Sequence, residues 1–138
     1  MLSDLFAMLA AAGGPDVHPH AVSSKEERER WDRDVARFDA DLRTLESFFL
    51  DVVEGRLDAA KSEARAMSFF GVQGPWYTVG WRMAVSIEKV LGRPRLIDCM
   101  ADARLLLPTF DDAADQLAES EEAKLATWSE ELIEDLAR

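Results

Sequence analysis

Residues 23–55, SSKEERERWDRDVARFDADLRTLESFFLDVVEG, give the strongest structural signal in this sequence. Ser23 and Ser24 each precede a glutamate by three residues, and this spacing is typical of the capping box that starts a helix. Apolar side chains then recur at intervals of four and three residues, at Trp31, Val35, Phe38, Leu42, Leu45, Phe49 and Val52. This heptad stripe predicts one long amphipathic helix from about residue 25 to residue 54, which Gly55 ends.

The other segments also favour helices, separated by glycine and proline turns. We expect helices over 3–12, 58–70, 76–91, 95–100 and 103–107, and two more that begin at Thr109 and Ser120. The apolar side chains expected to face inward are Ala60, Ala64, Met67 and Phe70 in the third helix, and Leu125, Trp128, Leu132 and Leu136 in the last. No segment alternates as a strand would. The sequence therefore predicts one domain, residues 1–138, of the all-α class: an irregular multi-helix bundle with one long central amphipathic helix.

Charge and hydropathy exclude several classes of function. The formal net charge of −11 argues against DNA or RNA as partners, because phosphate binding needs clustered lysine and arginine. No apolar run approaches the ~20 residues that a membrane span requires, and no basic region precedes the first apolar stretch. We therefore expect a cytoplasmic protein that does not contact a membrane. Cys99 is the only cysteine, so an internal disulfide is excluded.

A proline-containing loop holds the two histidines of the chain, His18 and His20. An H-x-H pair in a loop offers two imidazoles to Zn²⁺ or another divalent transition metal, and Asp16 stands beside it as a carboxylate ligand. Asp4, or else a glutamate of the capping boxes (Glu26, Glu27), would complete such a site, in this chain or in a second subunit. The alternative is an exposed loop whose histidines bind nothing.

Three aromatic side chains and one glutamate are the other candidates. Tyr77 follows a Gly-Pro turn at the start of a helix, where its phenol could stabilise an oxyanion, with Trp76 and Trp81 lining a substrate pocket. Alternatively, the three rings pack together and lock the turn. Glu88 lies among apolar residues and is either a half-buried catalytic carboxylate or an exposed partner for a neighbouring cation.

Several strings together resemble a known family. They are AMLAAAGGP at 7–15, GPWYTVGW at 74–81 with RMA at 82–84, IE at 87–88, LGR at 91–93 and D-x-R-x-L-L at 102–107. With them the chain resembles the C-terminal region of a bacterial family of predicted zinc-dependent peptidases of the H-E-x-x-H type. The resemblance implies zinc held by the two histidines of that motif and by a downstream glutamate, with the motif's own glutamate activating the metal-bound water.

The 138 residues contain no H-E-x-x-H. At the position that the resemblance assigns to the downstream glutamate, the chain carries Asp4. We therefore expect a truncated, zinc-peptidase-like helical domain that begins after the zinc helix and does not cleave peptides by the family's mechanism.

Three hypotheses for function follow. The first is weak metal-dependent hydrolysis of a small-molecule substrate, with His18 and His20 on the metal and Tyr77 polarising the substrate. The second is a non-catalytic helical interaction module. The third is metal-free hydrolysis in an aromatic pocket, with a carboxylate as base. Because truncation would expose apolar surface, we also expect a homodimer, with the heptad stripe or the first helix at the interface.

Overall fold

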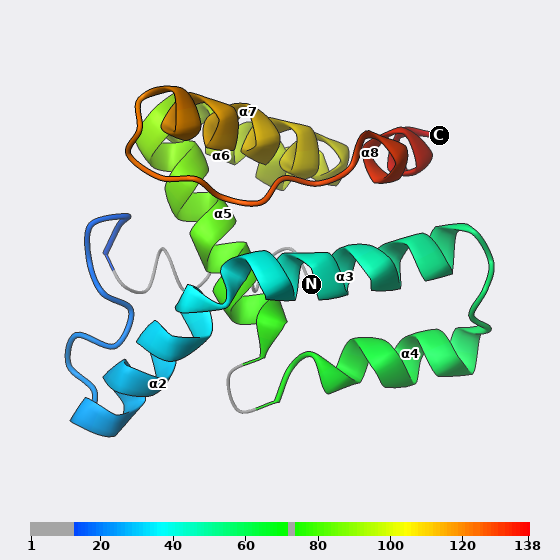
Figure 1. Ribbon diagram of the computed structural model, residues 1–138, viewed down its shortest axis with the longest axis horizontal. Helices are drawn as coiled ribbons and strands as arrows, with labels where there is room; N and C mark the ends of the chain where they lie inside the picture. The colour runs from blue at the N-terminus through cyan, green and yellow to red at the C-terminus, as the bar shows by residue number, and fades with distance from the viewer. Residues whose placement is uncertain (1–12, 72–73) are drawn as a thin grey trace.

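The computed structural model describes residues 13–71 and 74–138, which form seven α-helices and one short 3-10 helix (Figure 1). The described residues contain no strand, so the predicted all-α class is confirmed. The helix predicted over 3–12 falls outside the described residues. The elements are α2 Lys25–Ala36, α3 Phe38–Val53, α4 Ala59–Ser68, α5 Pro75–Leu91, α6 Arg93–Ala101, a 3-10 helix Ala103–Leu105, α7 Leu106–Glu119 and α8 Glu130–Ala137.

The helix predicted over residues 25–54 is two helices, α2 and α3, joined at Arg37. Its start is as predicted: Ser24 and Glu27 form the capping box, and the backbone N–H of Ser24 lowers the pKa of the Glu27 carboxyl. At Arg37, however, φ is −88° and ψ is 11°, and its N–H donates to the Asp34 carbonyl three residues back. On either side of this bend, α2 and α3 both pack against α5.

The heptad stripe is buried for most of its length. Trp31, Phe38, Leu42 and Leu45 are buried within the chain, as the stripe predicts. Near its end, Phe48 is buried instead of Phe49, and Val52 is 39% exposed. The buried half of the stripe faces α5 of the same chain. Four helices pack against α5: α2 and α3 near one end of it and α6 and α7 near the other (Figure 1).

The third predicted helix, α4, begins as expected at Asp58, whose carboxylate accepts the Lys61 backbone N–H at 2.8 Å. Its inward face was predicted wrongly, because Met67 is 60% exposed while Phe69 is 8% exposed. The indole Nε1 of Trp76 donates to the Ala66 carbonyl at 2.8 Å, and the Phe69 ring packs edge-on against Trp76. The last turn of α4 therefore closes over the buried Trp76, and Met67 on α4 faces solvent.

Between α5 and α7, the predicted position where a helix ends is correct, but a predicted N-cap is not. Gly92, at φ 92°, separates α5 from α6, and Pro94 lies in the first turn of α6. Asp102, rather than Thr109, caps the next turn by accepting the Arg104 N–H. Thr109 is buried inside α7, so the prediction that it begins a helix is wrong.

The last predicted helix begins nine residues later than expected. Ser120 ends α7, Ser129 caps α8, and residues 123–129 form an extended segment between them, which we call the C-terminal strap (Figure 1). Carboxylates of α3 and α7 accept the backbone N–H groups that a helix would have used: Asp39 from Ala126 at 2.7 Å, Asp111 from Trp128 at 2.9 Å and Glu46 from Ser129 at 2.6 Å. These three bonds replace helical hydrogen bonds and hold the strap across the bundle.

Candidate functional site

The histidine loop, residues 13–24, is held to α2 by His18. Its Nε2 lies 2.8 Å from Asp32 Oδ1, and its Nδ1 accepts the backbone N–H of His20 at 3.0 Å. Because Nδ1 accepts a hydrogen bond, the proton of the neutral ring is on Nε2, which donates to Asp32. Both ring nitrogens of His18 are therefore engaged within the protein.

His20 is the first of a series of rings that leads from the loop into the bundle. Its Nδ1 lies 3.1 Å from Ser23 Oγ, and its ring centroid lies 5.3 Å from that of Trp31. Trp31 in turn packs edge-on against Trp81 of α5, with centroids 5.4 Å apart. The predicted pocket residue Trp81 thus lies under the histidine loop rather than beside Trp76.

The other predicted metal ligands do not converge on the histidines. Asp16 forms an ion pair with Lys89 of α5 at 2.9 Å, and Glu27 is engaged in the capping box. Asp4 lies outside the described residues. Among the described residues, no group of three candidate ligand side chains includes His18 or His20. A metal role for the loop stays a prediction.

The predicted catalytic residues lie at opposite ends of α5. Tyr77, in its first turn, is half-buried, with its ring centroid 6.0 Å from that of Phe70. Glu88, near its end, accepts a hydrogen bond from Arg93 Nε at 2.7 Å across the Gly92 turn. Eleven residues of helix separate them by about 16 Å. Tyr77 and Glu88 therefore do not act on the same bond.

The GPWYTVG string positions the start of α5. Gly74 is the N-cap and Pro75 the first helical residue, an arrangement that suits the fixed φ of proline. A Cβ at position 74 would collide with the backbone carbonyl of Phe69, so only glycine allows α4 to come this close. The close approach brings Trp76 under α4, where it is 5% exposed.

An apolar crevice of about 40 Å³ lies between α3, α5, α7 and the C-terminal strap. Nine residues line it: Leu45, Phe49, Trp76, Val79, Gly80, Met83, Leu106, Leu107 and Trp128. Of these nine, only Trp76 was predicted from the sequence as a site residue. One available signal was Gly80, because glycine inside a helix costs about 1 kcal/mol relative to alanine and indicates a position where something approaches closely.

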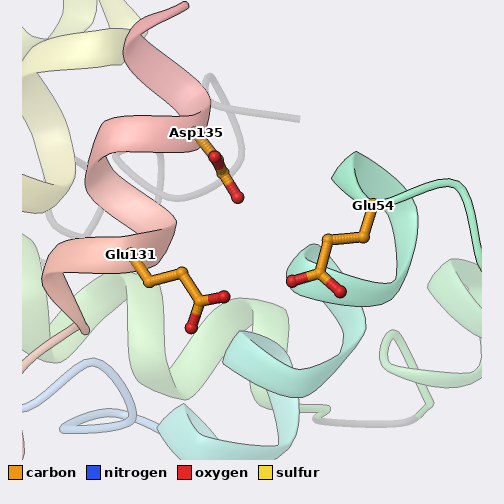
Figure 2. A group of neighbouring side chains, drawn as sticks. All are labelled: Glu54, Glu131 and Asp135. Atoms are coloured by element: carbon orange, nitrogen blue, oxygen red, sulfur yellow. The ribbon is translucent and has the colours of Figure 1, made fainter.

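An acidic cluster, Glu54, Glu131 and Asp135, joins the end of α3 to α8 (Figure 2). One carboxylate oxygen of each residue lies within 4.8 Å of the others. Glu54 also pairs with Arg56, and Asp135 with Arg138 at 3.5 Å. Glu54 and Glu131 are exposed and Asp135 is half-buried, and the three carboxylates offer only oxygen ligands, which calcium and magnesium prefer.

As they are arranged in this structure, the described residues do not form a site that fits a zinc ion. Zinc sites in proteins are built mainly from histidine nitrogen and cysteine sulfur, with carboxylates as additional ligands. His18 uses both ring nitrogens within the loop, and Cys99 is fully buried, so that burial raises the pKa of its thiol and disfavours the thiolate. The acidic cluster supplies neither nitrogen nor sulfur.

Comparison with known proteins gives one match. Residues 6–119 match the family described as putative zinc dependent peptidase (DUF5700), whose name suggests dependence on zinc. No curated protein and no solved structure matches the chain. The matched range contains the histidine loop and eight of the nine crevice residues, all but Trp128; it does not contain Glu131 or Asp135. None of the described helices combines the length and apolar character needed to cross a membrane.

Proposed function

This chain belongs to the family described as putative zinc dependent peptidase, which its residues 6–119 match, and we propose that it is a peptide-binding helical domain of that family. In this proposal it holds a substrate segment against α5, and any zinc ligands come from outside the described residues. One observation carries the proposal: the strings that carry the family resemblance also line the crevice. Trp76, Val79 and Gly80 come from GPWYTVG, and Leu106 and Leu107 from D-x-R-x-L-L.

The crevice residues would act by binding and orienting a substrate. Apolar walls exclude water around a substrate side chain, so burying it there is favourable by roughly 25 cal/mol per Å² of apolar surface. A peptide segment fixed in this way has lost much of its conformational freedom before any reaction begins. This lowers the entropic part of the activation barrier. Zinc, when a member of such a family binds it, supplies a polarised water as nucleophile.

A second candidate function is weak metal-dependent hydrolysis at the histidine loop. It is favoured by the closeness of His18, His20 and Asp32, which are residue types that bind transition metals. It requires His18 to exchange its bonds to Asp32 and to the His20 N–H for a bond to the metal. In the second candidate, metal binding would therefore break the bonds that hold the histidine loop to α2. In the first candidate, these bonds stay intact.

Unstructured casein peptides, incubated with metal-free protein, test the proposal. We expect saturable binding, followed by fluorescence anisotropy of labelled peptide, and no hydrolysis that depends on added zinc or stops with EDTA. Absence of saturable binding would overturn peptide binding. Zinc-dependent hydrolysis that stops with EDTA and is lost in a folded His18→Ala protein would instead establish the second candidate.

A further inference from the structure

A charged groove lies where α2 bends into α3. Its volume is about 410 Å³, which falls within the range of about 300–1,000 Å³ that is usual for small-ligand sites. Residues of α2 and α3 line the groove on both sides of the bend, α5 contributes Arg82, and the C-terminal strap contributes Lys124 and Leu125. More of its surface is polar than apolar, and it shares no lining residue with the apolar crevice. It is therefore a separate candidate site.

Arg82 reaches this groove from the middle of α5. It is the only residue of α5 in the lining, so its long side chain, rather than the helix backbone, reaches the groove. Arg82 is half-buried, and its guanidinium forms no ion pair or hydrogen bond with any residue that the structure describes. Two other half-buried arginines differ, since Arg28 donates to the Ser23 carbonyl at 2.5 Å and Arg65 to Asp51 at 2.6 Å. Arg82 thus offers hydrogen-bond donors that the described residues leave unused.

The two carboxylates of the groove are already used within the protein. Asp32 Oδ1 lies 2.8 Å from His18 Nε2, and Asp39 Oδ1 accepts the Ala126 N–H at 2.7 Å. Neither carboxylate forms an ion pair with Arg82. The charge that the groove leaves uncommitted is therefore positive, although the formal net charge of the chain is −11.

The charges of the groove favour a singly charged anion. Lys124 adds a second cation, which is exposed and forms no ion pair with another described residue. A carboxylate matches the fork of the Arg82 guanidinium and accepts two charge-assisted hydrogen bonds from it. Because Asp32 and Asp39 also line the groove, its formal charge is zero, and a dianion such as a phosphate group would be repelled more strongly than a carboxylate.

The rest of the groove suits a short aliphatic group. Its apolar lining comes from Val35 and Leu125, which are half-buried, and from the edge of Phe38, which is 5% exposed. Burying an aliphatic group against these side chains removes apolar surface from water, which favours binding. A ligand with a carboxylate at one end and a few carbons at the other would use both parts of the groove.

We propose that this groove binds a small organic monocarboxylate, whose carboxylate lies against Arg82 and Lys124. The aliphatic part of the ligand packs on the apolar side chains of α2, α3 and the strap. The C-terminus of a peptide carries the same chemistry, and only that source of the carboxylate rests on the proposed function. The groove, its charge and the size of its ligand do not.

The Nε–Hε signal of Arg82 in a ¹H–¹⁵N NMR spectrum at mildly acidic pH reports on this site directly. 4-Methylpentanoate should shift it saturably, whereas 4-methylpentanamide, which has nearly the same shape and no charge, should not. Inorganic phosphate at the same concentration should have little effect. The signal of Arg33, which is exposed on α2 outside the groove, is the internal control. No saturable shift of Arg82, or an equal shift with the amide or with phosphate, would overturn the proposal.

Three glutamine substitutions supply matched variants, with binding followed at the backbone N–H of Leu125. Arg82→Gln should weaken 4-methylpentanoate binding about tenfold or more, because it removes a charged donor from a half-buried position. Lys124→Gln should weaken it about threefold, since an exposed charge contributes less. Arg33→Gln should leave it unchanged. A melting temperature close to that of the parent shows that each variant is folded, and unchanged affinity in folded Arg82→Gln protein would overturn the proposal.

Two further ligands separate the sources of the carboxylate. N-acetyl-alanyl-leucine that binds at least tenfold more tightly than 4-methylpentanoate, and loses this affinity as its C-terminal amide, would identify a peptide C-terminus as the ligand. Equal or weaker binding would identify a free organic acid.

Casein binding separates the proposal from the proposed function. Absence of saturable casein binding, with the Arg82 shift by 4-methylpentanoate intact, would retire the peptide-binding function and leave the carboxylate site in place. Saturable casein binding without any shift of Arg82 by 4-methylpentanoate would overturn the carboxylate site alone.

Discussion

The histidine loop and the apolar crevice are opposite kinds of candidate site. The loop holds residue types that do chemistry, yet His18 and Asp16 use their polar atoms to hold the loop to α2 and α5. The crevice is lined only by apolar side chains and glycine, yet it encloses space that they do not fill. Residue type alone therefore points to the loop, whereas unfilled space points to the crevice; a buried indole N–H without a partner among the described residues occurs near both, in Trp81 and in Trp128.

The largest effect is expected at the crevice wall. Trp128→Ala removes a side chain that is 4% exposed and should lower the free energy of unfolding by about 3–5 kcal/mol. Met67→Ala, at a 60% exposed position, is the control and should change it by less than about 0.5 kcal/mol. Urea unfolding measures both. A loss below about 1 kcal/mol for Trp128→Ala would mean that the strap does not pack as described.

A pH-dependent effect of intermediate size is expected at Asp111, which binds the strap. Burial, with smaller contributions from Asp115 and Glu46, raises its pKa to about 6. The folded state then holds a proton that the unfolded state releases, so this group favours folding more as the pH falls from above 6 towards 3.8.

Asp111→Asn isolates this effect, because it keeps a carbonyl acceptor for the Trp128 N–H and removes the charge. After allowance for partial exposure, the variant should be more stable than the parent by about 1 kcal/mol at pH 8, with no advantage at pH 4. Thermal unfolding across that pH range is the measurement. An advantage that is equal at both pH values would show that Asp111 is not the titrating group.

A smaller effect is expected at the histidine loop. His18→Ala and Asp32→Ala should each cost about 0.5–1 kcal/mol, since the pair is largely solvent-exposed. The double variant should cost less than the sum of the two, and a double-mutant cycle measures the coupling. Strict additivity would show that the two side chains do not interact in solution.

The smallest effect is expected in the acidic cluster. Glu131→Gln removes one of three neighbouring carboxylates and should raise the melting temperature by about 1–2 °C, because like charges repel weakly at an exposed site. Glu130→Gln, which changes the neighbouring residue outside the cluster, is the control. A lower melting temperature for Glu131→Gln than for the control would mean that the cluster stabilises the fold.

The sequence predicts those parts of the fold that depend on neighbours along the chain. Ser24 and Asp58 start helices because their caps need only the next three residues, and Gly92 breaks one because of its own backbone conformation. The bend at Arg37 was not predictable in this way, since a heptad pattern gives a period but not the position of the helix it packs against. The strap was missed because the Asp39 carboxylate that holds Ala126 is 87 residues away in the sequence.

The same distinction between neighbours along the chain and distant residues applies to the candidate sites. The histidines, Tyr77 and Glu88 were identifiable from residue type, but their partners, Asp32, Phe70 and Arg93, became evident only in the folded chain. The crevice depends on which packed apolar side chains leave a gap, and no periodicity encodes that. Gly80 was the one residue whose presence in a helix indicated a close approach.

Zinc titration of metal-free protein by isothermal calorimetry, compared with a His18→Ala/His20→Ala variant, shows whether the loop histidines serve structure or bind a metal. If the loop histidines serve structure, the two proteins should show the same zinc binding. One equivalent of zinc bound with a Kd below about 1 μM, roughly 8 kcal/mol of binding free energy, and lost in the variant would instead make the histidine loop the metal site.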